Sequence, residues 1–201
     1  MDAWAIIPVK PLPLGKSRLA GVLDPAARTA LNRRLFERVF ARARDAIGVG
    51  RIVVVSADEA VLAWVRGSGA HALREPGGGL NDALEHASRY AAERGAEAVI
   101  VLPSDLPEIE RDDIAALKDA LGPPPACAIA PDGTEKGTNA LALRPPAAGL
   151  FRFGPQSFAL HRDAARALGY GVRVVCRAGL AQDLDTPEGY HHWIQKPGAT
   201  A

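Results

Sequence analysis

The sequence predicts an α/β fold in which helices pack against a mostly parallel sheet, and two observations support this. Short apolar runs rich in β-branched residues alternate with longer stretches of helical period, which is typical of successive βαβ units. A glycine-bearing loop with three cations follows the first apolar run, at the edge where open α/β sheets bind ligands. Strands are predicted at residues 3–9, 51–56, 70–74, 97–102, 126–131, 139–143 and 172–176.

Helix signals fall between these strands. Asp24 followed by Pro25 is typical of a helix start, with a capping side chain and a proline at the first helical position. The apolar residues that recur about every fourth position along this long helix are Leu31, Leu35, Val39 and Ala43. Gly77 to Gly79 break the chain before the next amphipathic helix begins at Leu80. Further helices are predicted over residues 59–66, 111–121, 157–168 and 186–193.

Length and composition limit the classes of function. The chain has 201 residues and a formal net charge of +1, which predicts a single domain over residues 1–195 and a flexible tail at 196–201. The balanced charge argues against nucleic acid or a membrane surface as the main partner. No apolar run approaches the ~20 residues that span a bilayer, and the first nine residues lack the basic start of a signal peptide, so we expect a cytoplasmic protein. Cys127 and Cys176 are too few for a disulfide framework and are expected to be reduced and buried.

The loop after the first predicted strand is a candidate phosphate site. Lys10, Lys16 and Arg18 lie in it together with Gly15, and backbone N–H groups and cations in such a loop can hold a triphosphate. A solvated surface loop with ordinary lysines is the alternative. The segment from Gly15 to Ser17 resembles the end of a Walker A loop. That motif requires a glycine five positions before Gly15, where this sequence has Lys10, so the loop is not a P-loop.

Two acidic segments are candidate metal ligands. Asp105 directly follows the apolar strand at 97–102, and Asp183 and Asp185 precede a predicted helix that begins near Thr186. Each segment also has a structural explanation, because such residues make turns and cap helices. If the sheet brings both segments beside the cationic loop, their carboxylates would form an oxygen site for Mg²⁺, which binds one or two carboxylates together with substrate phosphates.

Two further polar stretches interrupt apolar surroundings. Residues 132–139 join two predicted strands, and residues 153–158 open a helix whose free N–H groups suit an anion. Turn formation and helix capping are the alternative explanations. His161 lies one turn into that helix, where we expect a packing or hydrogen-bonding role rather than a catalytic base.

Six motifs, taken in this order, make the sequence resemble the 2-phospho-L-lactate guanylyltransferase family. They are Pro8-Val9-Lys10 with Gly15-Lys16-Ser17-Arg18-Leu19, Gly79-Leu80-Asn81, Pro103-Ser104-Asp105-Leu106-Pro107, Gly137-Thr138-Asn139, Phe153-Gly154 with Ser157-Phe158 and His161, and Asp183-Leu184-Asp185-Thr186-Pro187-Glu188. That family makes the phosphodiester intermediate of coenzyme F420. The resemblance extends from residue 4 to about residue 193 and implies a three-layer α/β/α, Rossmann-like nucleotidyltransferase fold with a mostly parallel mixed sheet. Gly189 and Tyr190 depart from the usual closing motif, a change that concerns helix packing.

The resemblance also implies roles for the candidate residues. The nucleotide-binding residues would be Lys10, Gly15, Lys16 and Arg18 on the phosphates of GTP, with Gly79 and Asn81 near the guanine or ribose. The catalytic residues would be Asp105, Asp185 and Lys16, with Mg²⁺ held by Asp105, Asp185 and Asp183. The acceptor-binding residues would be Gly137, Thr138, Gly154 and Ser157.

The implied reaction transfers GMP from GTP to a small phosphorylated carboxylic acid and releases pyrophosphate. Phosphoenolpyruvate, 2-phospho-L-lactate and 3-phospho-D-glycerate are the candidate acceptors. One alternative is a nucleotidyltransferase for another acceptor, such as the molybdopterin cofactor, and a second is a nucleotide-binding module without catalysis. The sequence leaves open the acceptor, the choice of base, the number of metal ions and whether the chain forms a homodimer.

Overall fold

A computed structural model describes residues 1–196. The predicted tail therefore lies, apart from Lys196, outside the described residues. The strands are β1 (Ala3–Val9), β2 (Ile52–Ser56), β3 (His71–Arg74), β4 (Ala98–Val101), β5 (Ala126–Pro131), β6 (Thr138–Arg144) and β7 (Gly171–Val174). The helices are α1 (Pro25–Ile47), α2 (Glu59–Ser68), α3 (Leu80–Ala92), α4 (Arg111–Ala120), α5 (Ser157–Ala167), α6 (Ala178–Ala181) and α7 (Pro187–Ile194), with 3₁₀ turns η1 (Leu12–Leu14), η2 (Ser17–Leu19) and η3 (Val49–Arg51).

The seven strands form one mixed sheet in the order β3-β2-β1-β4-β6-β5-β7. Only β6 runs against its neighbours β4 and β5, and the other neighbouring pairs are parallel. The predicted three-layer fold with a mostly parallel mixed sheet is confirmed. Because the strand order reverses beside β1, a crevice opens at the carboxyl ends of β1 and β4, where open α/β sheets bind ligands.

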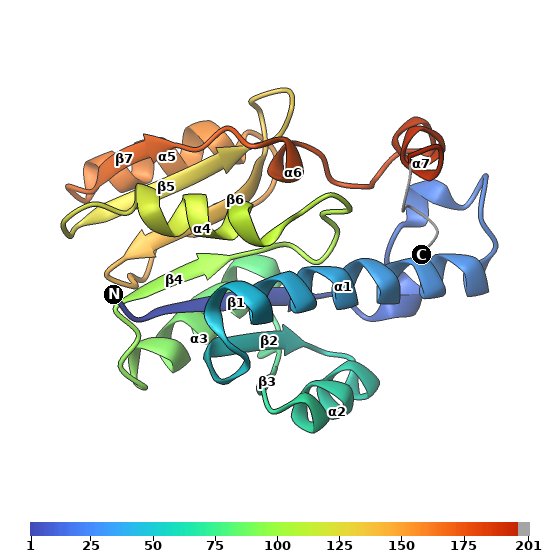
Figure 1. Ribbon diagram of the computed structural model, residues 1–201, viewed down its shortest axis with the longest axis horizontal. Coiled ribbons are helices and arrows are strands. Elements are labelled where there is room, and N and C mark those ends of the chain that lie inside the picture. Colours follow the sequence, from blue (N-terminus) through green and yellow to red (C-terminus); the bar gives the residue numbers. More distant parts are fainter. Residues whose placement is uncertain (197–201) are drawn as a thin grey trace.

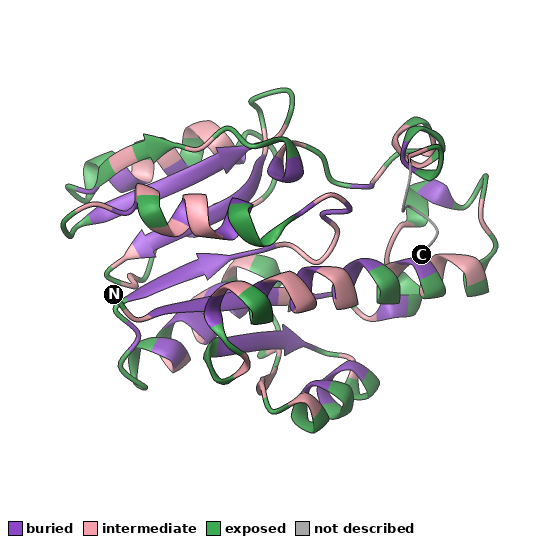
Figure 2. Cartoon of the chain, in the orientation of Figure 1, coloured by how far each residue is buried: buried purple, intermediate pink, exposed green. Residues whose placement is uncertain are grey.

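Helices cover both faces of the sheet (Figure 1). One apolar cluster joins alternate residues of β1 and β2 to α1, α2, α4 and α6, and a second joins the other face of the sheet to α3 and α5. The central strands are buried on both sides, whereas the edge strand β7 is largely exposed (Figure 2). Burial on both faces explains why the central strands read as continuous apolar runs rather than as alternating ones.

The predicted helix starts match the structure. The Asp24 carboxylate accepts a hydrogen bond from the Ala27 N–H at 2.8 Å, and the Thr186 hydroxyl accepts one from the Gly189 N–H at 3.1 Å. Within residues 1–196, none of the helices has the length and apolar character needed to cross a membrane. Cys127 is buried as expected, but Cys176 is exposed because it follows the edge strand β7, which corrects the expectation of two buried thiols.

The segment after β7 differs from the sequence prediction. The strand is Gly171–Val174 rather than residues 172–176, and the short helix α6 follows it. Tertiary contacts hold α6 in place: the Arg177 guanidinium donates to the buried Asp113 carboxylate at 2.8 Å, and the Asn139 amide donates to the Leu180 carbonyl at 2.9 Å. These partners come from α4 and β6, so local sequence gives little sign of the helix.

Close packing at Gly179 places the acidic segment that follows α6. A Cβ atom at this position would lie 2.7 Å from the Glu108 backbone oxygen, which is closer than atoms pack without strain. We therefore predict that Gly179→Ala destabilises the fold by about 1–3 kcal/mol, as overpacking in a filled site does. The measurement is the free energy of unfolding in urea.

Gly67→Ala is the matched control for this substitution. Gly67 lies inside α2 with no atom near its Cβ position, so alanine there should be neutral or stabilising by up to ~1 kcal/mol. Equal stability of the Gly179→Ala variant and the wild-type protein would contradict the packing argument.

Candidate functional site

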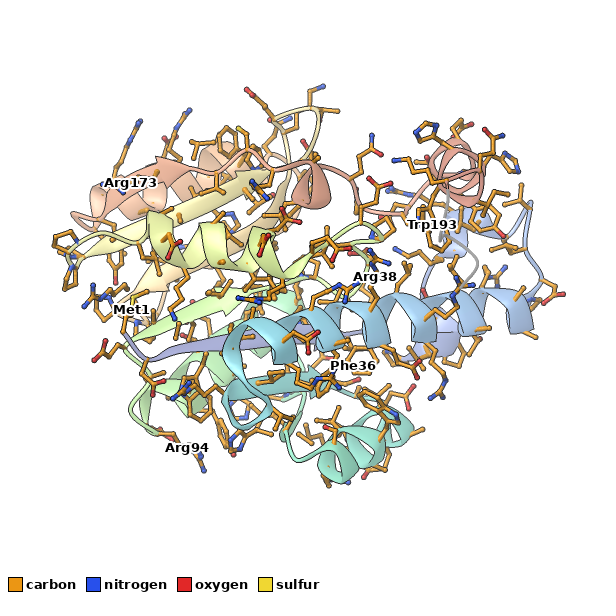
Figure 3. All side chains as sticks on the ribbon, in the orientation of Figure 1. Met1, Phe36, Arg38, Arg94, Arg173 and Trp193 are labelled. Atoms are coloured by element: carbon orange, nitrogen blue, oxygen red, sulfur yellow. The ribbon has the colours of Figure 1, made fainter. Side chains whose placement is uncertain are left out.

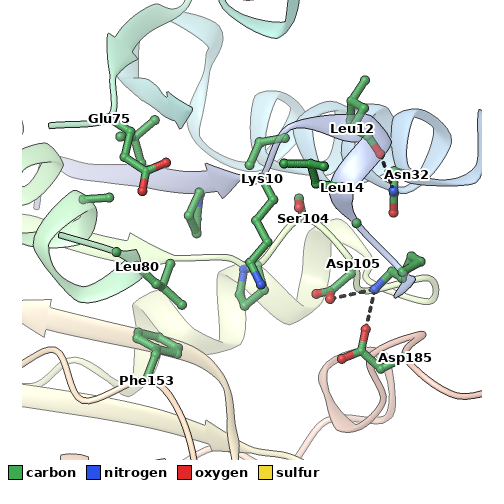
Figure 4. A pocket seen from close by; sticks show the side chains of 18 of the residues that line it. Lys10, Leu12, Leu14, Asn32, Glu75, Leu80, Ser104, Asp105, Phe153 and Asp185 are labelled. Carbon is green, nitrogen blue, oxygen red and sulfur yellow. Dashed lines mark hydrogen bonds and ion pairs between the residues drawn. The ribbon is translucent and has the colours of Figure 1, made fainter. Parts of the chain in front are cut away.

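A pocket of about 480 Å³ lies at the carboxyl ends of β1, β2 and β4. Figure 4 views this pocket from close by. Its lining residues come from the strand ends, the cationic loop, the start of α3 and two later segments. The lining includes Lys10, Gly15, Lys16, Arg18, Asn32, Glu75, Gly79, Leu80, Asp105, Phe153 and Asp185.

The cationic loop is folded tightly against α1. The Asn32 amide on α1 donates a hydrogen bond to the Leu12 carbonyl at 2.7 Å, and a Cβ atom at Gly15 would lie 2.5 Å from the same amide. Gly15 therefore permits the close approach of the loop to α1. Lys16 follows with φ 55° and ψ 36°, a left-handed conformation. Such a backbone is costly for a residue with a side chain and persists only where surrounding contacts hold it.

The Lys16 ammonium connects the two acidic segments. Its Nζ atom lies 2.8 Å from Asp105 Oδ2 and 2.8 Å from Asp185 Oδ1, and its side chain is only 5% exposed. Burial alone would lower the pKa of Lys16, but the charges and hydrogen bonds of Asp105 and Asp185 outweigh it and raise the pKa above its ordinary value of 10.5. Lys16 is therefore charged at neutral pH, and the stability that its ion pairs contribute is lost only as the pH rises above that value.

Buried leucines hold in place the two segments that carry Asp105 and Asp185. Leu106 anchors the turn that presents Asp105. Leu184 packs with Leu19 and with Trp193 of α7, which lies near the N-terminal half of α1 (Figure 3). The Leu184 N–H donates to the Asp105 carbonyl at 3.1 Å, so the two acidic segments are joined through the backbone as well as through Lys16. Apolar burial thus places Asp185 opposite Asp105 although 80 residues separate them in the sequence.

Asp183 completes a cluster of three carboxylates with ligand atoms within 4.8 Å of one another. Desolvation raises the pKa of Asp183, and the charges of Asp105 and Asp185 raise it further. Three carboxylates lie near two cations, the Lys16 ammonium and the Arg18 guanidinium 4.0 Å from Asp185, which leaves an excess of one negative charge. The oxygen donors, their spacing and this excess fit a hard divalent cation, so Asp105, Asp183 and Asp185 are candidate metal ligands.

The other predicted nucleotide-binding residues fall into two groups. Lys10, Gly15, Arg18 and Gly79 line the pocket, and Figure 4 shows the Lys10 side chain extending into it. Asn81 does not line the pocket. Its side chain instead accepts from the Phe153 N–H at 2.8 Å and donates to the Phe153 carbonyl at 3.2 Å. Asn81 therefore holds Phe153, which does line the pocket, and its contribution to the site is indirect.

The predicted acceptor-binding residues lie beside the pocket rather than in its lining. Thr138 begins β6, which runs antiparallel to β4, so it lies at the sheet edge where Asp105 follows β4. The Thr138 N–H donates to the Ser157 hydroxyl at 2.9 Å, and the Gly137 N–H donates to the Asp132 carboxylate at 2.9 Å. Gly154 directly follows Phe153 in a backbone with φ 135°.

The structure adds pocket residues that sequence reasoning missed. Glu75 follows β3, and its N–H donates to the Ser56 carbonyl at 3.0 Å, which continues the pairing with β2. Its carboxylate is drawn toward the pocket in Figure 4 and has no hydrogen-bond or ion-pair partner among residues 1–196. Asn32 was also missed, whereas Phe153 was named in a motif without a place in the pocket, and the place of Glu75 after a predicted strand could have indicated it.

Solved structures of other proteins share the fold of this chain. A protein described as a nucleotide-diphospho-sugar transferase from Desulfovibrio desulfuricans superposes with a TM-score of 0.75 at 19% identity, covering 92% of this chain and 83% of that chain. A CMP:2-keto-3-deoxy-manno-octonic acid synthetase superposes with a TM-score of 0.65 at 19% identity, covering 96% of both chains. The chain has the nucleotidyltransferase fold.

Sequence comparison identifies the family. Residues 3–194 match the family model described as "Guanylyl transferase CofC like". A phosphoenolpyruvate guanylyltransferase of Rubrobacter xylanophilus is 50% identical over 188 residues, covering 94% of this chain and 91% of the relative. A 2-phospho-L-lactate guanylyltransferase of Methanothermobacter thermautotrophicus is 38% identical over 190 residues, covering 94% and 82%. The chain belongs to the CofC-like guanylyl transferase family and is a nucleotidyltransferase, as the resemblance of its motifs implied.

The raised pKa of Asp183 leads to a prediction about the metal-free protein. Because its folded-state pKa lies above the ordinary value of 3.8, the folded state binds the proton more tightly, and stability is lost as the pH rises through that range. At neutral pH the ionised Asp183 therefore destabilises the fold. Asp183→Asn should raise the Tm by ~1–3 °C at pH 7 in EDTA and have no such effect near pH 3.

Asp163→Asn is the control, since Asp163 is exposed on α5 away from the cluster. A lower Tm for Asp183→Asn than for the wild-type protein at pH 7 would show that Asp183 has a stabilising partner, contrary to this account.

Proposed function

We propose that this chain transfers GMP from GTP to the phosphate of a small phosphorylated carboxylic acid and releases pyrophosphate, as a step in coenzyme F420 biosynthesis. The observation that carries the proposal is the contact of Lys16 with both Asp105 and Asp185 at the edge of a pocket large enough for a nucleotide. Phosphoenolpyruvate is the first candidate acceptor, because relatives at 50% and 42% identity bear the name phosphoenolpyruvate guanylyltransferase.

The proposed reaction is an in-line displacement at phosphorus. An oxygen of the acceptor phosphate forms a bond to the α-phosphorus of GTP, and the bond from that phosphorus to the bridging oxygen breaks, so pyrophosphate leaves with the electron pair. The acceptor phosphate is already deprotonated near neutral pH, so no side chain has to remove a proton. The barrier comes from the repulsion of two anions and from charge that gathers on the leaving oxygen.

The cations of the loop oppose both sources of the barrier. Lys10 and Lys16 enter the pocket beside Asp105, and Arg18 lies 4.0 Å from Asp185 at the outer rim. We assign these side chains to the phosphates of GTP. Asp105 and Asp185, with Asp183 as a further ligand, would hold Mg²⁺, which when bound neutralises phosphate charge and orients the reacting oxygens. In this arrangement the transfer step needs no histidine or cysteine side chain.

The opposite end of the pocket suits a guanine base. Leu80 and other apolar side chains line it, and Glu75 supplies one carboxylate. The negative charge of the Glu75 carboxylate is unfavourable in a pocket that also holds a polyphosphate, unless hydrogen-bond donors of the ligand contact it. Guanine presents two adjacent donors, N1–H and the N2 amine, and a carboxylate can accept from both. Adenine, cytosine and uracil offer no such pair, so Glu75 favours guanine in this proposal.

The observations favour the proposed function over the two alternative functions. Relatives at 50% and 42% identity are named for phosphoenolpyruvate rather than for a molybdopterin acceptor. A binding module without catalysis would have no use for a buried lysine that contacts two of three clustered carboxylates. Product analysis separates the proposed function from both alternatives.

The direct test is the mass of the product formed from GTP, MgCl₂ and an equimolar mixture of phosphoenolpyruvate, 2-phospho-L-lactate and 3-phospho-D-glycerate. We expect pyrophosphate release and one dominant guanylylated acid. Absence of any guanylylated acid, with GTP bound but intact, would favour the binding module.

The carboxylates that hold the metal should be essential for turnover. Asp105→Asn and Asp185→Asn should each lower kcat by roughly 10³-fold or more, because each removes a charged ligand from the place where charge must be neutralised. Both variants should still unfold cooperatively, since the volume change is small. Asp112→Asn, at an exposed position on α4, is the matched control and should retain wild-type turnover. Retention of near wild-type kcat by either site variant would remove that residue from the mechanism.

Base selection should depend on Glu75. Glu75→Gln can accept only one of the two guanine donors, so we expect the KM for GTP to rise ~10-fold, about the value of one hydrogen bond to a charged group. Inosine triphosphate lacks the N2 amine, and the wild-type preference for GTP over it should largely disappear in the variant. Glu93→Gln at the far end of α3 is the control. An unchanged ratio of the two nucleotides would assign base recognition elsewhere.

A further inference from the structure

A buried polar network beside the pocket has no part in the mechanism given above. Its members are Thr138, Ser157 and His161, which are 6%, 2% and 1% exposed. The His161 ring also packs edge-on against Phe153, with centroids 4.7 Å apart, and Phe153 lines the pocket. Buried polar side chains are costly unless their hydrogen bonds are made, so the direction of each bond can be worked out.

The hydrogen bonds of His161 fix its tautomer. The Arg152 backbone N–H, which can only donate, lies 2.8 Å from His161 Nε2. Nε2 must therefore be the unprotonated acceptor. Burial and the charge of Arg152 lower the pKa of His161 to about 4 and outweigh the opposing effect of a hydrogen bond with the Ser157 backbone, so the ring is neutral at neutral pH. In a neutral ring with Nε2 unprotonated, the single proton lies on Nδ1.

The direction of the next bond follows from this tautomer. His161 Nδ1 lies 2.9 Å from the Thr138 hydroxyl oxygen, so Nδ1–H donates and the hydroxyl accepts. The Thr138 N–H donates in turn to the Ser157 hydroxyl oxygen at 2.9 Å. Each hydroxyl oxygen thus accepts a bond from the protein, and neither hydroxyl hydrogen has an acceptor among residues 1–196. Both hydroxyls remain available as donors, and two adjacent donors suit an anion.

Neighbouring contacts place this pair close to the reacting groups. Thr138 begins β6 at the sheet edge where Asp105 follows β4, and the next residue, Asn139, donates to the Leu180 carbonyl just before the acidic segment. Phe153, which packs against His161 and lines the pocket, connects the network to the pocket wall. An anionic group held by the two hydroxyls would therefore lie on the side of the carboxylate cluster away from the base.

We propose that His161 is a positioning residue: its Nδ1–H holds the Thr138 hydroxyl so that the hydroxyl hydrogen is free to donate to an anionic group of the acceptor, the ligand that the family resemblance already assigns to Thr138 and Ser157. The inference rests on the proposed function, since it assigns that anion to the phosphorylated acid. His161 itself contacts neither substrate, and it acts through the hydroxyl of Thr138.

The test measures phosphoenolpyruvate binding by calorimetry with MgCl₂ present, which does not require turnover. His161→Phe keeps a ring but loses both nitrogens, and Thr138→Val removes the hydroxyl with little change in shape. Each should weaken phosphoenolpyruvate binding roughly 10- to 100-fold and leave GTP binding unchanged. In the double variant the loss should be no greater than in Thr138→Val alone, because His161 acts only through Thr138.

Two controls separate positioning from a merely structural role. His161→Asn retains an N–H donor near the Nδ1 position and should recover most of the binding lost in His161→Phe. His71→Phe replaces a histidine in a distant ring cluster with Trp4 and Tyr90 and should bind both ligands as the wild type does. Additive losses in the double variant, or wild-type affinity in a folded His161→Phe variant, would overturn the proposal.

Nitrogen NMR of the wild-type protein gives an independent check that requires no variant to fold. The proposal expects the Nε2 signal of His161 to be that of an unprotonated nitrogen from pH 6 to pH 8, and a protonated Nε2 would overturn it. Guanylyl transfer with no response of phosphoenolpyruvate affinity to Thr138 or His161 would reject this inference alone. Failure of the wild-type protein to guanylylate any acid would reject the proposed function instead.

Discussion

The candidate site depends on one buried contact, in which the Lys16 ammonium lies 2.8 Å from carboxylate oxygens of both Asp105 and Asp185. The three residues come from the loop after β1, the turn after β4 and the segment before α7. Three distant parts of the chain thus meet at the carboxyl edge of the sheet. The left-handed backbone of Lys16 and the close packing of Gly15 on Asn32 are understandable as requirements of this contact.

Different side chains hold the candidate site in place and carry its charge. Apolar side chains such as Leu106, Leu184 and Trp193 bury the flanks of the two acidic segments, while the carboxylates stay partly accessible at the pocket edge. The cluster then carries more negative than positive charge, which is unfavourable in the protein alone and favourable once a divalent cation and a polyphosphate are present. The charge that suits the cluster to a divalent cation is therefore also a local source of instability.

Sequence patterns predict the parts of the fold that are governed by local rules. The apolar runs of β1, β2 and β4, the caps at Asp24 and Thr186, and the place of Asp105 after a strand all follow from spacing and residue type. Helix α6 was missed because partners on α4 and β6 hold it. The indirect position of Asn81 depends on packing between elements, which one sequence does not reveal, whereas Glu75 could have been indicated by its place after a predicted strand.

The family motifs and the physical analysis agree on the carboxylates and the lysine, but they contribute different information. The motifs point to candidate residues, and the structure shows their contacts: Lys16 joins two carboxylates, Asn81 supports Phe153, and the hydroxyls of Thr138 and Ser157 each accept a hydrogen bond from the protein. The directions of these hydrogen bonds follow from the donors and acceptors available to each group.

The most direct test of this account is a crystal structure with Mn²⁺ and a non-hydrolysable GTP analogue, in which anomalous scattering locates the metal. The account predicts a Mn²⁺ peak coordinated by oxygens of both Asp105 and Asp185, with Lys10 and Lys16 contacting the phosphates. A metal position that excludes either aspartate, or a nucleotide bound outside the pocket beside β1 and β4, would contradict it.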